Sequence, residues 1–380
     1  MLKKEDLKVL NVMTLPEISN IRMFNQQISS TKINGVKEIA GWMGAMQAQD
    51  YSMAKWAIGT RLPESSEKDI ENAINKGDII RTHLLRPTWH FVSSDDIHWM
   101  LELTAPAIKS SMKSRHKELE LTEPLLKRYV DLIQKSLEGG SHLTREEMVS
   151  IMKKEKIATE NNRASHILFM AELEGIICNG VIKNKKQTYA LLNERVHKKK
   201  DFTKEEALEK LAKKYFLSHG PATLQDFTWW SGLPVRDARN ALEMAKPHFI
   251  SEKTDTNTYW LSGSFPGKLT VENHVYLLPA FDEFMISYKD RTPSLSLIHN
   301  KKAISNNGFF RPIVILNGQV AGLWKRTIKN DKALVETFFF KQVSKSVKHQ
   351  IEKKANALGK FLDKETVVIH HKHDITTIPA

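Results

Sequence analysis

The sequence predicts an α+β protein in which three tandem winged helix-turn-helix modules are followed by a C-terminal β-rich domain that forms a partial barrel. Over the first 300 residues, the chain repeats one order of elements loosely three times: two or three amphipathic helices, then two short strands around a turn. Helices followed by a β-hairpin wing are the winged variant of the helix-turn-helix. The copies are unequally spaced, which indicates tandem modules and not a solenoid.

These repeats set the expected domain boundaries. Residues 1–105 are expected to hold the first module with an N-terminal segment, residues 106–200 the second module, and residues 201–270 the third. Residues 271–380 are expected to form the β-domain. A charged stretch over 195–201 separates the second copy from the third, as a linker would.

The first copy shows helical spacing followed by strand patterns. Apolar residues at i, i+3, i+4 and i+7 predict an amphipathic helix, and they occur at Val36, Ile39, Ala40 and Met43. Strands are predicted over 80–84 and 88–92, because apolar and β-branched residues flank a turn at Arg86-Pro87.

Capping boxes mark helix starts in the second and third copies. Residues 144–147 read Thr-Arg-Glu-Glu and residues 203–206 read Thr-Lys-Glu-Glu, and in both the Thr and the last Glu can cap each other's backbone N–H. A basic turn is expected at 183–186. The strands predicted for these two copies are 176–178, 188–191, 249–250 and 259–261.

The last part of the chain is predicted to be mainly β. Asn317-Gly318 lies between two apolar runs, and this dipeptide favours the type I′ turn of a two-residue hairpin. A helix is predicted over 344–362. The predicted strands are 274–279, 312–316, 319–324, 333–340 and 366–370.

The composition indicates a polyanionic partner. The chain has 57 Lys and Arg against 44 Asp and Glu, a net charge of +13, which favours nucleic acid, although a generally basic surface would give the same count. One cysteine, Cys178, excludes a disulfide framework, a Cys-rich zinc module and an Fe–S cluster, and fits a reducing compartment. No apolar run approaches the ~18 residues of a membrane span. We therefore expect a cytoplasmic protein without membrane association.

Known cofactor patterns are absent from the sequence. It contains no G-x-x-x-x-G-K-[ST], G-x-G-x-x-G or G-x-S-x-G, so ATP-driven, dinucleotide-dependent and hydrolase-elbow chemistry lack support. The adjacent acids Asp282 and Glu283 have no His or Cys at ligand spacing nearby. We expect no nucleotide cofactor and no metal.

The most informative segment is Gln47-Ala48-Gln49-Asp50. Asp50 is a good N-cap for a helix starting near Ser52, so Gln47 to Gln49 should form a non-helical link in which both amides can project to one side. Two carboxamides can hold and orient a water, but they cannot act as a strong general base. The alternative is that both amides bond only to loop backbone.

Residues 81–91 hold a second group of candidates. Strand alternation places Thr88 and His90 on one face and Trp89 and Phe91 on the other, in the core. The first face and the arginines can meet a phosphate or line the pocket, although a strand histidine is more often structural. The candidate contacts from this segment are Arg81, Arg86, Thr88 and His90.

Four further candidates lie late in the chain. Asp282 is expected to orient an arginine or a bound base edge, and Arg291 to form an ion pair or turn with Asp290. Lys325 and Arg326 belong to a basic strand that can follow phosphates. An edge strand protected by positive charge is the alternative for this pair.

The chain resembles the AlkZ/YcaQ winged-helix superfamily over nearly its whole length. The resemblance rests on Gln-Ala-Gln-Asp at 47–50, on Arg-Thr at 81–82 with Thr-Trp-His at 88–90, and on the stretch 279–291. It implies a bacterial, monofunctional DNA glycosylase that hydrolyses the N-glycosidic bond of bulky or cationic alkylpurines, with adducts at N7 or N3. Some members of the family also unhook interstrand crosslinks.

The resemblance also implies roles for particular residues. AlkZ-like members use a Gln-x-Gln pair in catalysis where YcaQ-like members carry Gln-x-Asp, so Gln47 and Gln49 become the catalytic pair by position. The family engages DNA with a β-hairpin of the C-terminal domain, for which the strands around Asn317-Gly318 are the candidate.

Two hypotheses from different classes remain at this point. The first is the enzyme just described, and the second is a non-catalytic winged-helix DNA-binding protein. In both, the expected partner is double-stranded DNA, and three modules in one chain favour a monomer on a single duplex site.

Overall fold

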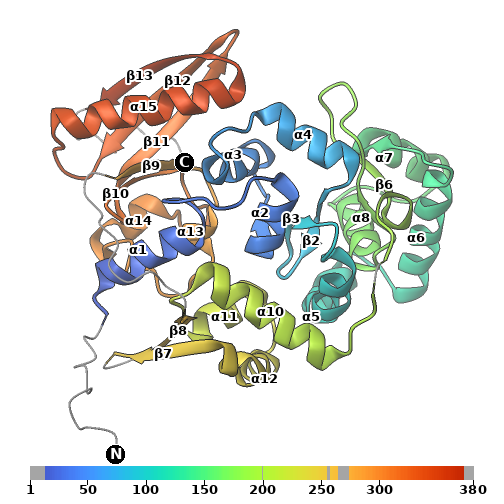
Figure 1. Ribbon diagram of the computed structural model, residues 1–380. Helices are drawn as coiled ribbons and strands as arrows, with labels where there is room; N and C mark the ends of the chain where they lie inside the picture. The colour runs from blue at the N-terminus through green and yellow to red at the C-terminus, as the bar shows by residue number, and fades with distance from the viewer. Residues whose placement is uncertain (1–12, 199, 255–256, 264–273, 372–380) are drawn as a thin grey trace, which may run out of the picture.

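Four β-sheets organise the protein, and helices accompany each of them (Figure 1). The computed structural model describes residues 13–198, 200–254, 257–263 and 274–371. In the described residues, two sheets have three strands, one has two and one has five. This mixture of helices and sheets agrees with the predicted α+β class. The boundary expected at residue 270 lies outside the described residues.

The first sheet positions the Gln-x-Gln segment. Its middle strand is β3, which pairs with β1 and β2, so that His90 lies opposite Gln47 on one side and Thr82 on the other. β1 was not predicted, because three residues are too few to show alternation. The elements of this unit are α2 (Val36–Met43), β1 (Ala45–Gln47), α3 (Tyr51–Arg61), α4 (Glu67–Lys76), β2 (Ile79–Leu84) and β3 (Thr88–Ser93).

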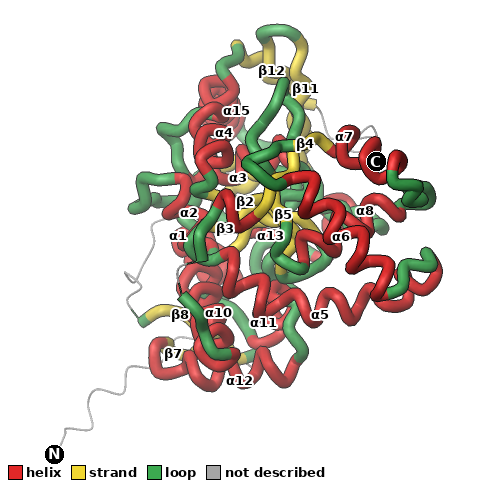
Figure 2. The backbone as a smooth tube through the Cα atoms, turned by 90° about the vertical axis from the view of Figure 1, so that its right-hand side faces the viewer, coloured by secondary structure: helices red, strands yellow, loops and turns green. Residues whose placement is uncertain are grey.

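A long helix, α5 (Ile97–Glu118), links the first unit to the second (Figure 2). The sequence analysis did not predict this helix, and the boundary expected between residues 105 and 106 falls inside it. Thr144 and Glu147 form the predicted capping box. The second unit contains α6 (Glu123–Leu137), β4 (Leu143–Thr144), α7 (Arg145–Lys154), α8 (Arg163–Leu173), β5 (Ile177–Asn179), β6 (Thr188–Leu191) and α9 (Leu192–Arg195).

The helices of the third unit pack against the first unit. Thr203 and Glu206 form the second predicted capping box, at the start of α10. Packing between α10 and α2 holds this unit against the first one. The unit contains α10 (Lys204–His219), α11 (Leu224–Ser231), α12 (Val235–Ala245), η1 (Lys246–His248), β7 (Phe249–Lys253) and β8 (Thr258–Ser262).

The C-terminal sheet has the order β13-β12-β11-β10-β9. β12 and β13 are parallel because α15 crosses over between them, and β9 and β13 are the two edges of an open sheet in the described part of the chain. This unit contains β9 (Val275–Leu278), α13 (Glu283–Ile286), η2 (Leu297–His299), α14 (Asn300–Ala303), β10 (Ile313–Leu316), β11 (Gln319–Lys329), β12 (Lys332–Phe339), α15 (Lys345–Leu362) and β13 (Glu365–His371).

The predicted Asn317-Gly318 turn is confirmed, but it is covered. Both residues have positive φ, and Leu316 pairs with Gln319, as a two-residue type I′ hairpin requires. The Ser19 hydroxyl of α1 (Leu15–Asn25) donates to the Gly318 carbonyl at 2.5 Å. The sequence analysis missed α1, which lies between this sheet and the third unit (Figure 1).

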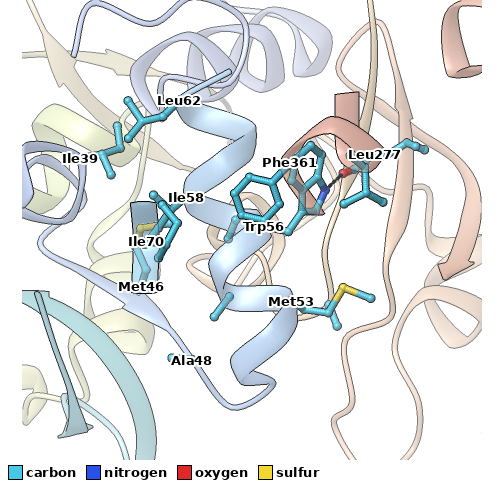
Figure 3. Packing of buried hydrophobic residues seen from close by; sticks show 14 of the residues in the cluster. Ile39, Met46, Ala48, Met53, Trp56, Ile58, Leu62, Ile70, Leu277 and Phe361 are labelled. Carbon is cyan, nitrogen blue, oxygen red and sulfur yellow. Dashed lines mark hydrogen bonds between the residues drawn. The ribbon is translucent and has the colours of Figure 1, made fainter. Parts of the chain in front are cut away.

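An apolar core joins α3 to the C-terminal unit. Trp56 of α3 packs on Phe361 of α15 with ring centroids 5.2 Å apart (Figure 3). The Trp56 indole also donates to the Leu277 carbonyl of β9 at 2.9 Å. The helix that follows the Gln-x-Gln segment is therefore anchored on residues more than two hundred positions away in the chain.

A fully buried ion pair reinforces the same junction. Arg61 at the end of α3 forms a bidentate pair with Asp282, with distances of 2.9 and 3.0 Å. Its remaining N–H groups donate to Gln26 and to the Ala57 carbonyl. Asp282 thus orients an arginine, which was one of its two predicted roles.

Among the helices that the structure describes, none combines the length and the apolar character that a membrane span requires.

We expect Arg61→Met to destabilise the protein by about 3–5 kcal/mol, because it leaves the Asp282 carboxylate buried without its partner. Urea unfolding measures this free energy. Arg115→Met is the matched control, since Arg115 pairs with Glu118 at the surface and should cost at most about 1 kcal/mol. Equal costs for the two variants would contradict a structural role for the buried pair.

Candidate active site

Gln47 is held at both its backbone and its side chain. Its N–H donates to Oε1 of Glu283 at 2.6 Å, and its side-chain Oε1 accepts from Nη2 of Arg86 at 3.1 Å. Because a guanidinium can only donate, this contact fixes which end of the amide is the oxygen. No protein acceptor is hydrogen-bonded to the amide nitrogen in the described part of the chain. Gln47 is 6% exposed.

Gln49 lies in the bend that follows β1, and its side chain is exposed. The bend is fixed on both sides. The Ala48 N–H donates to the Trp89 carbonyl at 2.7 Å, and Asp50 caps α3 by accepting from the Met53 N–H at 3.0 Å. The predicted non-helical link and the predicted N-cap are therefore both confirmed, and the segment carries one buried and one exposed amide.

Glu283 is a buried carboxylate at the centre of the site, and the sequence analysis gave it no role. Besides the Gln47 N–H, it accepts from the Trp230 indole at 3.2 Å and from the Ser287 hydroxyl, and His219 lies 3.8 Å away. Burial alone would raise its pKa, but His219, Ser287 and the Gln47 N–H favour the charged form and bring the pKa to about 2. Glu283 is therefore an anion at neutral pH.

Arg86 reaches Gln47 from the turn between β2 and β3. Burial lowers its pKa, and Glu283 opposes that shift. Gly232, at the end of α11, has φ +66, and a Cβ there would lie 2.3 Å from the Leu85 carbonyl. Only glycine permits this close approach, which brings the Arg86 turn against α11.

The sheet face that carries Gln47 is polar and buried. His90 has no solvent exposure, and burial followed by the charge on Arg86 lowers its pKa to about 3, so its ring is neutral. Its Nδ1 bonds to the Thr88 carbonyl at 2.9 Å. Buried polar groups usually pair with water when protein offers no partner. Four atoms here lack a protein partner: Thr82 Oγ1, Thr88 Oγ1, His90 Nε2 and Arg86 Nε.

The opposite face of the hairpin carries Arg81. Its guanidinium donates twice to the Ala48 carbonyl, at 3.0 and 3.1 Å, and lies 4.3 Å from the Trp89 ring. Arg81 therefore supports the Gln-x-Gln bend from behind. Phe91 is in the core as predicted, whereas Trp89 is only half-buried.

The remaining candidate residues differ in how close they lie to the Gln-x-Gln segment. Arg326 of β11 donates to the Ser52 hydroxyl, three residues after Gln49. Lys325 pairs with Glu336 at 3.1 Å across the strands. Pairing of β11 with β10 ends at Leu323, so among the described strands β11 pairs only with β12 at these two residues, and the edge-strand alternative stays open. His90 and Asp282 were candidate DNA contacts, but both side chains are buried and do not reach the surface.

Arg291 lies beside the site, near Trp229 of α11. Its Nε donates to the Met285 carbonyl at 2.9 Å, and its guanidinium is 5.4 Å from the Trp229 ring. In the described residues the ion pair with Asp290 does not form, but the predicted turn does: Asp290 accepts from the Thr292 N–H and hydroxyl, and the Arg291 carbonyl accepts from the Ser294 N–H. Among the described residues, no group of three or more His, Cys, Asp or Glu side chains could hold a metal ion.

Comparison with known proteins identifies the family. The profile described as "DNA glycosylase AlkZ-like" matches residues 40–361. The chain belongs to the AlkZ-like DNA glycosylase family. By that membership it is a DNA glycosylase, a hydrolase. The resemblance seen in the sequence is thereby confirmed.

Two comparisons, both with Streptomyces sahachiroi, show how far the likeness extends. A protein named "Interstrand DNA cross-link repair glycosylase" is 22% identical over 345 residues, covering 84% of this chain and 88% of its own. The solved structure of "DNA glycosylase AlkZ" superposes with a TM-score of 0.78 at 18% identity, covering 94% of this chain and 100% of that one. At this identity the second comparison establishes the fold.

The neutral state of His90 predicts a pH-dependent contribution to stability. Unfolded His90 titrates near pH 6.5, while folded His90 stays neutral down to about pH 3. Between these values the unfolded state binds more protons, so stability falls as pH falls, by up to about 1.4 kcal/mol per pH unit. His90→Gln should remove this slope, as measured by urea unfolding from pH 7.5 to 4.5. Parallel curves for the two proteins would contradict a buried neutral ring.

Proposed function

We propose that this AlkZ-like glycosylase hydrolyses the N-glycosidic bond of bulky or cationic alkylpurines in duplex DNA, with Gln47 and Gln49 at the reacting sugar. The observation that carries the proposal is the double restraint on Gln47, by Glu283 and Arg86, beside the exposed Gln49. Family membership gives the class of reaction, and this geometry gives the place where it would occur.

Two amides suffice for a substrate that is already activated. A purine alkylated at N7 or N3 is cationic, so it leaves as a neutral base and needs little protonation. The enzyme then has to place a water at C1′ and stabilise positive charge developing on the sugar. Carboxamide oxygens accept hydrogen bonds without titrating near neutral pH. General acid–base catalysis typically raises a reaction rate by about 10²–10⁴-fold. Because the bond to a cationic base is already labile, we propose that orienting the water is enough.

The exposed position of Gln49 suits bulky lesions. Many glycosylases rotate the damaged nucleotide into a tight pocket, which a large adduct or a crosslink would not enter. A surface amide beside a restrained amide can meet the sugar while the base stays in the duplex. We therefore include interstrand crosslinks among the substrates, because the Streptomyces relative is named as a cross-link repair glycosylase.

The β11–β12 hairpin is the best candidate for the DNA-engaging hairpin of the family. The hairpin at Asn317-Gly318 is covered by α1 and cannot meet a duplex. The turn at 330–331 is exposed, with exposed Lys329 and Lys332 on either side. Three residues before Lys329, Arg326 contacts Ser52, so the hairpin rises next to the Gln-x-Gln bend. We propose that Lys325 and Arg326, where the hairpin leaves the sheet, also contact the DNA backbone.

The catalytic assignment is tested with duplexes that carry 7-methylguanine or a nitrogen-mustard crosslink. Incubation followed by hot alkali should break the strand at the adduct. Gln47→Ala and Gln49→Ala should each lower the single-turnover rate at least tenfold, because the water loses its orientation. Their affinity for DNA should stay within about twofold, since neither amide carries charge.

Gln350→Ala, in α15, is the matched control and should keep full activity. Tight binding by the wild type without an abasic product from either substrate would instead favour the non-catalytic DNA-binding protein. Cleavage of the methylated duplex alone would restrict the substrates to monoadducts.

The hairpin assignment is tested by salt dependence. Each lost phosphate contact reduces the slope of log K against log salt by about 0.9. Lys329→Ala with Lys332→Ala should therefore flatten the slope by about 1–2, as measured by fluorescence anisotropy on duplex DNA. Lys348→Ala with Lys360→Ala, on α15, is the control pair with the same loss of charge. Equal slopes for both double variants would remove this hairpin from the interface.

A further inference from the structure

Three cations surround one half-exposed indole beside Gln47. Trp229 of α11 is 36% exposed and donates through its indole N–H to the Ile286 carbonyl at 2.8 Å. The Lys289 ammonium lies 5.0 Å from the ring centroid, and the guanidinium carbons of Arg291 and Arg86 lie 5.4 and 5.9 Å from it. The indole face attracts cations, so this ring holds three positive groups in one place.

These cations have no carboxylate partner. Among the described residues, no Asp or Glu oxygen lies within salt-bridge distance of Arg86, Lys289 or Arg291. Asp226 is the nearby acid that neutralises Arg291 most. Its oxygens, however, are occupied by the backbone N–H groups of residues 223, 289 and 290 and by Arg22. Glu283 also acts on Arg86, and Asp290 on Arg291, so opposite charge lies near the cluster without a carboxylate oxygen of the described residues in direct contact with the three cations.

Two buried N–H groups in the cluster also lack an acceptor. Nε of Arg86 and Nη2 of Arg291 are buried without a protein partner. Burial is the main cause that lowers the pKa of Arg291, to about 10, and the charge on Arg86 adds to it. Gathering like charges with unpaired donors costs free energy. An anion next to the three cations would offset the repulsion between their like charges.

The cluster is connected directly to the catalytic amide. Arg86 donates through Nη2 to the Gln47 oxygen, and its side chain is only partly buried. An anion on the remaining donors of Arg86 would sit next to the position where Gln47 meets the sugar. In DNA, the anions nearest a deoxyribose are its own flanking phosphodiesters.

We infer that Arg86, Lys289 and Arg291, arranged around Trp229, form a binding subsite for one phosphodiester that flanks the alkylated nucleotide. This inference rests on the proposed function. The sequence predicted separate DNA contacts for Arg86 and Arg291. The subsite adds Lys289 and Trp229 and assigns all four residues to a single phosphate. It also places that phosphate beside the reacting sugar. A phosphate bound by Arg86 would also keep this guanidinium directed at the Gln47 oxygen. The same contact would then set the position of the enzyme along the DNA strand and the orientation of the Gln47 amide.

The test uses Lys289→Met with Arg291→Met, which removes charge but keeps side-chain length. Arg86 stays unchanged, since it touches Gln47. Binding to undamaged duplex is measured against salt concentration, and the slope should fall by about 0.9, the value for one phosphate contact. Lys301→Met with Lys302→Met, on α14, removes the same charge from exposed positions and should leave the slope within about 0.2. Thermal unfolding checks that both variants fold.

A second measurement locates the phosphate. Duplexes are made with a single neutral methylphosphonate at each linkage within two nucleotides of a 7-methylguanine. One linkage should weaken wild-type binding at least as much as the double substitution does, and it should weaken binding by the double variant less, because only Arg86 still contacts that phosphate. If no such linkage exists, or if the double variant keeps the wild-type slope, the subsite is wrong. Excision of 7-methylguanine by the wild type is scored separately, so its absence would reject the proposed function while the salt slope still tests the subsite.

Discussion

The buried carboxylate of Glu283 is the constraint on which the active site depends. It lies in the C-terminal unit, yet it accepts the backbone N–H of Gln47 in the first unit and the indole N–H of Trp230 in the third. An ionised carboxylate without solvent contact is stable only when donors surround it. The three units must therefore dock together before the charge is satisfied, and docking fixes the position of Gln47.

The same logic extends to the arginines. Arg61 is satisfied completely by Asp282, Gln26 and Ala57, and so acts as a structural anchor. Arg86 and Arg291 keep unpaired donors. Unpaired donors by themselves do not mark a binding site, since the fully buried Arg22 also keeps one.

If Gln47 and Gln49 meet the reacting sugar as proposed, no described side chain that transfers protons lies at the reacting atoms. His90 faces Gln47 across the sheet but is buried and neutral, and Glu283 is ionised and fully occupied. Neither is placed to transfer a proton to a substrate. The candidate site offers one restrained amide, one exposed amide and positive charge, which would suit the cationic base and the polyanionic strand of the proposed substrate.

The sequence by itself determined the local elements and the family. Capping boxes, the Asn317-Gly318 turn and the strands at 80–84 and 88–92 depend on neighbours within a few residues, and the structure has them where the patterns predicted. Only the tertiary structure decided which residues meet. Glu283 next to Gln47, Trp229 among three cations and Gly318 under α1 join segments that are far apart in the chain, and no periodicity records such contacts. The physical reason is that burial and charge pairing are properties of the docked units, whereas spacing reports a single segment.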